Sequence, residues 1–134
     1  MTAIAPGQPR VGVGALIVDD QGRVLLGKRR REPEAGCWGI LGGKVDFGER
    51  VAETCAREVL EEAGVEIEVG ELICLVDQID IEAGTHWVSP VFRGRIVAGE
   101  PVNREPEALA AIGWFAPGDL PAPLTLATRR ALGL

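Results

Sequence analysis

Five glutamates lie within residues 49–62, and their spacing constrains this chain more than any other feature. Residues 49–63 are predicted to form one helix, because apolar side chains recur at steps of three and four. Gly64 follows and can end the helix in the left-handed conformation. The apolar stripe predicted to face a core consists of Ala52, Cys55, Ala56, Val59 and Ala63.

Three of these glutamates crowd one side of the last two helical turns: Glu58, Glu61 and Glu62. Like charges three and four residues apart repel one another. Carboxylates that stay together despite this repulsion are the hard oxygen ligands that Mg²⁺ prefers. The alternative is a solvated, glutamate-rich helix, but it does not account for the glycines and Arg57 at fixed offsets. The spacing therefore favours a divalent metal site.

Composition narrows the class of protein. The chain has 134 residues, 46% of them hydrophobic and 25% charged, which is typical of a single globular domain. Its net charge of −6 disfavours nonspecific nucleic-acid binding and means that a phosphate substrate needs a bridging cation. No apolar run is long enough to span a membrane. We therefore expect one domain over 1–134, with residues 1–10 as a loose leader.

The three cysteines, Cys37, Cys55 and Cys74, form no C-x-x-C pair. A disulfide framework or a zinc site is therefore not expected. The first ten residues also lack the apolar core of a secretion signal. Together these features predict a cytoplasmic protein. A monomer and a homodimer both remain open.

Strands are predicted on both sides of the helix. Alternating or continuous apolar runs indicate strands at 11–18, 23–29, 65–70, 71–81, 86–97 and 112–115, with a turn at 19–22 and a closing helix at 125–132. Pro90 indicates an edge or bulge position within 86–97. Residues 37–43 are expected only to lead into the helix. This order predicts an α+β domain whose sheet has helices on both faces.

The segment 43–65 resembles the Nudix box at every defined position, and the resemblance extends further. The matching positions are Gly43, Glu49, Arg57, Glu58, Val59, Glu61, Glu62, Gly64 and Val65. Trp38-Gly39 ahead of the double glycine, and Trp114-Phe115 ahead of 119–121, also look like features of MutT-like members. The resemblance implies an α/β/α sandwich with a mixed sheet between helices. It also implies Mg²⁺- or Mn²⁺-dependent hydrolysis of a nucleoside diphosphate linked to another group.

The resemblance also implies roles for individual residues. Glu58, Glu61 and Glu62 would bind the metal together with the backbone carbonyl of Gly42. Glu49 and Arg57 resemble the pair that holds the loop and the carboxylates in register, and Glu49 is also a candidate for a second metal. Arg29 and Lys44 are similar in placement to residues that contact substrate phosphates.

Two positions depart from the pattern, and other residues have two readings. Leu41 stands where many members carry a proline. The upstream catalytic glutamate of many members has only Glu105 and Glu107 as nearby candidates, so the general base stays open among Glu58, Glu61 and Glu105. Trp87 either stacks on a base or packs at a strand edge.

Three functions fit these residues. The favoured one is a MutT-like enzyme that converts a (deoxy)nucleoside triphosphate, normal or oxidised, to the monophosphate and pyrophosphate. The second is cleavage of ADP-ribose or a nucleotide sugar. The third is a noncatalytic nucleotide sensor, which the intact carboxylate cluster disfavours.

Overall fold

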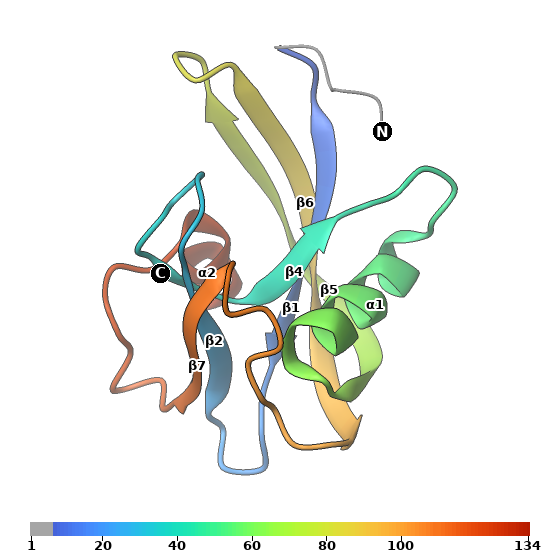
Figure 1. Cartoon of the computed structure of the whole chain (residues 1–134), viewed down its shortest axis with the longest axis vertical. Helices are drawn as coiled ribbons and strands as arrows, with labels where there is room; N and C mark the ends of the chain where they lie inside the picture. Colours follow the sequence, from blue (N-terminus) through green and yellow to red (C-terminus); the bar gives the residue numbers. More distant parts are fainter. Residues whose placement is uncertain (1–6) are drawn as a thin grey trace.

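The computed structural model describes residues 7–134, and Figure 1 shows long strands flanked by two helices. The strands are β1 (Arg10–Ile17), β2 (Val24–Arg29), β3 (Trp38–Gly39), β4 (Leu41–Lys44), β5 (Glu66–Asp80), β6 (Thr85–Ala98) and β7 (Leu109–Phe115). The helices are α1 (Val51–Ala63) and α2 (Leu126–Ala131). Of the predicted leader, residues 1–6 lie outside the described residues, while Arg10 already belongs to β1.

The strands form a four-stranded sheet in the order β4-β1-β6-β5 and a three-stranded sheet in the order β3-β2-β7. β1 and β6 pair in parallel, whereas β4, β5 and the strands of the smaller sheet pair antiparallel. The predicted α+β class with a mixed sheet is confirmed.

Alternation along β1 places the two helices on opposite faces of the larger sheet. Val13, Ala15 and Ile17 belong to the buried cluster that includes the apolar side of α1. Leu16 belongs to the other buried cluster, against which Leu126 of α2 packs. Because successive side chains of a strand point to opposite faces, this division confirms the predicted α/β/α sandwich.

Helix α1 packs through Cys55, Val59 and Ala63, all fully buried as predicted. Gly64 ends it at φ 70°, and its N–H donates to Leu60 O at 2.9 Å. Two details differ from the prediction. The helix begins at 51 instead of 49, and Ala52 is exposed while Thr54 is buried in its place.

The late start of α1 has a local cause. The Arg50 N–H donates to Glu53 Oε1 at 3.0 Å, which satisfies a donor at the first turn. Glu49 precedes this turn, and its carboxylate accepts from Thr54 and Arg57. The buried Thr54 hydroxyl donates to Glu49 Oε1 at 2.6 Å, so this polar group keeps a hydrogen-bond partner inside the protein.

Several strand boundaries also differ. Residues 66–80 form one continuous strand, not two, and β7 begins at 109 instead of 112. The segment expected only as a lead-in contains β3 and β4. Runs this short and rich in glycine have no apolar periodicity, so pairing with other strands determines whether they become strands.

Pro90 lies on an interior strand, so the edge alternative of the prediction is wrong. The bulge alternative agrees with a register shift between β5 and β6 at Leu72–Cys74, next to the Leu75–Pro90 pair. The ladder between β1 and β6 is also interrupted between the pairs Val11–Val88 and Gly14–Val91. A proline offers no N–H to a neighbouring strand, and an interrupted ladder accommodates that loss. Pro90 is buried there. Within residues 7–134, neither helix has the length and apolar character needed to cross a membrane.

Candidate active site

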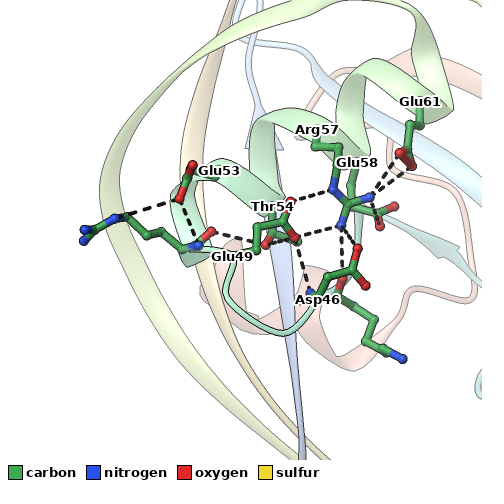
Figure 2. Close-up of polar contacts among 9 residues, drawn as sticks. Asp46, Glu49, Glu53, Thr54, Arg57, Glu58 and Glu61 are labelled. Atoms are coloured by element: carbon green, nitrogen blue, oxygen red, sulfur yellow. Dashed lines mark hydrogen bonds and ion pairs between the residues drawn. The ribbon is translucent and has the colours of Figure 1, made fainter. Parts of the chain in front are cut away.

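The loop between β4 and α1 is held by a bidentate ion pair between Glu49 and Arg57. Arg57 Nε donates to Glu49 Oε2 at 2.7 Å and its Nη2 donates to Oε1 at 2.9 Å. Asp46 lies 3.4 Å from the same Nη2 atom, and the Lys44 carbonyl accepts from it. Figure 2 shows Arg57 at the centre of this group. The planar guanidinium fits a carboxylate with two parallel hydrogen bonds, so the loop is fixed to the helix.

This arrangement keeps Glu49 ionised. Hydrogen bonds from Arg57 and then from Thr54 lower the pKa of the Glu49 carboxyl to about 2, against a smaller opposing effect of burial. The pKa of Arg57 is correspondingly raised, with Glu49 as the main cause. The structure thus places Glu49 and Arg57 together, as the sequence led us to expect.

Arg57 also contacts two of the three clustered glutamates. Its Nη1 atom donates to Glu58 Oε1 at 3.1 Å and to Glu61 Oε1 at 3.1 Å. The two acceptors differ in burial, because the Glu58 side chain is 17% exposed and the Glu61 side chain 48%. Glu58 therefore faces the protein and Glu61 lies at the solvent side of the same cation.

Glu58 lies against β4 at Gly43. A Cβ atom at Gly43 would overlap the Glu58 carboxylate. Burial raises the pKa of Glu58, and Glu61 and Glu105 raise it further, while Arg57 opposes them. At Gly42 a Cβ would overlap the Val13 carbonyl of the neighbouring strand. The double glycine therefore allows both the close pairing of β1 with β4 and the approach of Glu58.

Glu62 is the most deeply buried carboxylate of the cluster. Its Oε1 atom accepts the Gly42 N–H at 2.9 Å, which joins α1 to β4. Burial raises the pKa of Glu62 to about 8, and Glu58 and Glu105 add to the rise, while the Gly42 N–H and Arg29 oppose it. A cation at this position would oppose the rise in the pKa of Glu62, because it stabilises the ionised carboxylate.

The loop before β7 covers the end of α1 and brings in Glu105. The Val102 N–H donates to Ala63 O at 3.0 Å, and the Arg104 N–H donates to Glu62 O at 2.9 Å. The Glu105 N–H is held by Asn103 Oδ1 at 3.0 Å. Glu105 is half-buried and close enough to influence Glu58 and Glu62, whereas Glu107 is exposed. Of the two upstream candidates, Glu105 is the one that faces the cluster.

A cavity of about 280 Å³ opens beside the carboxylates. All three residues predicted to bind substrate, Arg29, Lys44 and Trp87, line it together with Gly42 and Glu62. Trp87 is partly covered by Arg10, whose guanidinium carbon lies 5.5 Å from the ring centroid. The lining of the cavity thus includes two cationic side chains, an aromatic ring and Glu62 of the acidic cluster.

The donor set fits a hard divalent cation, although the carboxylates do not converge in the described structure. Among residues 7–134, no three His, Cys, Asp or Glu side chains gather closely enough to hold a metal ion. Glu58 and Glu61 bond to Arg57, and Glu62 bonds to Gly42, so each is held by a neighbour. One guanidinium does not neutralise the carboxylates that share it, so the cluster keeps a negative charge. Carboxylate oxygens of this kind are ligands that suit Mg²⁺ or Mn²⁺.

Several residues of the site lie outside the set that the sequence indicated. Gln78 and Ser89 line the cavity from β5 and β6, Glu34 lines it from the loop before β3, and Thr54 supports Glu49. Only period-two alternation along 71–81 and 86–97 could have pointed to Gln78 and Ser89, since both share a sheet face with Trp87.

Comparison with known proteins gives the family of this domain. The NUDIX domain family model matches residues 8–132, so the chain belongs to the NUDIX family. The crystal structure of a MutT NUDIX hydrolase from Burkholderia pseudomallei is 56% identical, with a TM-score of 0.90 over 94% of this chain and 97% of that one. The predicted family and its MutT-like character are confirmed.

Two curated relatives carry different substrates in their names. The ADP-ribose pyrophosphatase of Methanocaldococcus jannaschii is 36% identical over 92 residues, 69% of this chain and 54% of that protein. The CTP pyrophosphohydrolase of Escherichia coli is 33% identical over 97 residues, 67% of this chain and 70% of that protein. The chain thus spans about half the length of the first relative, and family membership leaves the substrate undecided.

Proposed function

We propose that this protein hydrolyses nucleoside triphosphates, including deoxynucleotides, to the monophosphate and pyrophosphate with a divalent cation. One observation carries the proposal: Glu62 belongs both to the carboxylate cluster and to the wall of the cavity that Arg29 and Lys44 line. A cluster suited to a cation and a pair of cations suited to phosphates therefore meet at one residue.

The protein's own groups divide the work. Glu58, Glu61, Glu62 and the carbonyl of Gly42 would hold Mg²⁺ or Mn²⁺. When bound, the metal would neutralise phosphate oxygens and lower the pKa of a coordinated water. Lys44 and Arg29 supply positive charge toward the phosphates, and Trp87 offers an apolar surface to the base. Arg57 fixes Glu58 and Glu61 and is itself oriented by Glu49.

The reaction breaks one P–O–P bond. A water oxygen forms a new bond to one of the two phosphorus atoms, the bridging oxygen leaves with the other, and the water proton passes to a carboxylate. Glu58, Glu61 and Glu105 are the candidate acceptors, because all three surround the same region. A general base must lie within hydrogen-bond reach of the proton it takes.

The second candidate function is cleavage of ADP-ribose or a nucleotide sugar. Its support is a neighbouring cavity of about 510 Å³ that shares Gln78 and Trp87 with the first, so the cleft continues beyond the base-binding end. The name of the Methanocaldococcus relative points the same way. A third possibility, a noncatalytic sensor, would bind nucleotide without turnover.

Product analysis separates the three. The purified protein is incubated with the common ribo- and deoxyribonucleoside triphosphates, 8-oxo-dGTP and ADP-ribose, with Mg²⁺ or Mn²⁺. We expect monophosphate plus pyrophosphate. AMP plus ribose 5-phosphate would support the second function, and binding without turnover would support the sensor. Glu61→Gln and Glu62→Gln should each lower the rate strongly, and unchanged rates would contradict the assigned roles.

A further inference from the structure

The loop between β2 and β3 forms a wall that belongs to both cavities. Its base is closed by two backbone hydrogen bonds, from the Arg29 N–H to Cys37 O at 2.9 Å and from the Gly36 N–H to Arg29 O at 2.7 Å. Pro33 and Glu34, near the tip, line the first cavity and the second. This loop is therefore a wall that the two cavities share.

Glu34 connects this wall to helix α2. Its Oε2 atom accepts the backbone N–H of Leu126 at 2.8 Å, across 92 residues of sequence. Leu126 is the first residue of α2, where a helix cannot satisfy its own N–H groups. Thr125 caps the same turn by accepting from the Thr128 N–H at 3.3 Å, and Glu34 supplies the acceptor for the Leu126 N–H, which Thr125 does not bind.

The backbone of Glu34 is held in an uncommon conformation. Its φ of 64° makes it the sole non-glycine residue with positive φ among residues 7–134. Such a conformation is strained for an L-residue of this type and persists where surrounding contacts require it. Glu34 belongs to neither buried apolar cluster, so core packing does not explain it.

The residue before Glu34 orients a cation of the cleft. Arg29 Nε donates to the Pro33 carbonyl at 2.8 Å. Arg29 lines the same cavity as Lys44 and Glu62. One short path therefore runs from the Leu126 N–H, through the Glu34 side chain and the Pro33 carbonyl, to the Arg29 guanidinium.

We propose that Glu34 is a positioning residue for substrate binding. Its hydrogen bond to the Leu126 N–H, called the latch below, holds the 30–37 loop on α2 and thereby sets the width of the cleft and the direction of Arg29. The inference rests on the proposed function, because it takes the cavity as the nucleotide site. Glu34 acts through Arg29 and the cleft wall, so its loss should weaken binding and spare the chemical step.

Three substitutions at Glu34 separate the side-chain contact from the backbone strain. Glu34→Ala removes the acceptor and should raise KM about tenfold with kcat within about twofold, the size expected for one charged hydrogen bond. Glu34→Gln keeps an acceptor oxygen and should restore most of the affinity. Glu34→Gly relieves the positive φ and lacks the acceptor, so its KM should match that of Glu34→Ala. A wild-type KM in Glu34→Gly would overturn the proposal.

Two comparisons test the path to Arg29. Glu32→Ala is the matched control, because Glu32 lies on the same loop and also lines both cavities, but its carboxylate accepts within the loop, from the Ala35 N–H at 3.3 Å, and not from α2. It should change KM much less than Glu34→Ala does. An equal change would mean that the KM effect comes from the charge of the loop, which would contradict the latch. The double variant Arg29→Ala/Glu34→Ala should show a smaller KM rise than the product of the two single effects. Independent, multiplying effects would contradict the path.

Binding without turnover distinguishes this inference from the proposed function. Calorimetry with AMP, GMP, CMP and UMP should show about tenfold weaker binding to Glu34→Ala than to the wild type, for whichever monophosphate binds the wild type. If Glu34→Ala binds a monophosphate about tenfold more weakly than the wild type and the wild type hydrolyses no nucleotide, the proposed function fails while the latch stands. If turnover is normal and neither KM nor the monophosphate Kd changes in Glu34→Ala, the latch fails alone. A wild type that neither binds nor hydrolyses overturns both.

Discussion

Glu62 on α1 accepts the backbone N–H of Gly42 on β4 at 2.9 Å, so the end of the acidic helix is tied to the strand that borders the cavity. This contact places the most buried carboxylate of the cluster in the wall of the proposed substrate cavity. The register of β4 on β1 thereby determines where the carboxylates lie. Changes that shift β4 or α1 by a fraction of an ångström should act on the site before they act on the fold.

Gly43→Ala tests how closely α1 must approach β4. The added Cβ would overlap the Glu58 carboxylate, so Glu58 must move away from its position beside Arg57. We expect a loss of kcat/KM on the order of 100-fold, because small misplacements of positioned groups cost that much. Steady-state kinetics measures the loss. The matched control is Gly118→Ala, since nothing lies within 4 Å of a Cβ atom there. Equal activities of the two variants would contradict the tight contact.

The lowered pKa of Glu49 predicts a specific acid sensitivity. A carboxyl whose folded pKa of about 2 lies below its ordinary 4.5 stabilises the fold above about pH 4.5. This contribution is lost as the pH falls from about 4.5 towards 2. Glu49→Gln removes the titration, so the stability difference between wild type and variant should be largest near neutral pH and shrink in that window. Thermal unfolding in EDTA from pH 2.5 to 7 measures it. A pH-independent difference would show that Glu49 is not held by Arg57.

Thr54→Val tests the support beneath Glu49. The Thr54 hydroxyl is fully buried and donates to Glu49 Oε1 at 2.6 Å. Valine keeps the shape and leaves the carboxylate one donor short, so we expect a destabilisation of about 1–3 kcal/mol. Urea unfolding measures this change, and Thr54→Ser, which keeps the hydroxyl, should lose much less. The effect should largely disappear in a Glu49→Gln background. If Thr54→Val costs the same in both backgrounds, the hydroxyl and the carboxylate are not coupled.

Thiol reactivity reports the packing of α1 on the sheet. Cys55 is fully buried, and burial raises the pKa of its thiol to about 11. Cys37 and Cys74 are both partly exposed. In the native protein at pH 8, a thiol reagent should modify Cys37 and Cys74 well before Cys55, which should react fully only in denaturant. Mass spectrometry of the labelled peptides identifies the sites. Rapid native labelling of Cys55 would mean that α1 leaves the sheet readily.

The elements that carry their own periodicity were predictable from the sequence. Cys55, Val59 and Ala63 recur at helical spacing, and Gly64 provides a recognisable end, so α1 follows from local chemistry. The exchange of Ala52 for Thr54 on the buried side was not predictable, because the Thr54 hydroxyl is satisfied by Glu49, a contact that apolar periodicity does not show. β3 and β4 form by pairing with β2 and β1, and the local sequence pattern does not predict this pairing.

The residues of the candidate site also differ in how far the sequence could predict them. The residues of the box could be assigned because their spacing is fixed within one loop and one helix. Glu34 could not be assigned, since its partner Leu126 lies on the closing helix and only the folded chain brings them together. Gln78 and Ser89 enter the cavity through the pairing of β5 with β6. The cytoplasmic location and the oligomeric state stay predictions from the sequence.

The central claim is that the α1 carboxylates and the adjoining cavity form one metal-dependent pyrophosphohydrolase site. Its most direct test is hydrolysis of a nucleoside triphosphate panel in H₂¹⁸O, with Mg²⁺ added or removed by EDTA, comparing wild type with Glu62→Gln. We predict metal-dependent release of monophosphate and pyrophosphate in equimolar amounts, ¹⁸O in one of the two products, and a loss of at least about 100-fold in Glu62→Gln. Turnover that persists in EDTA, or an unchanged rate in Glu62→Gln, would contradict the claim.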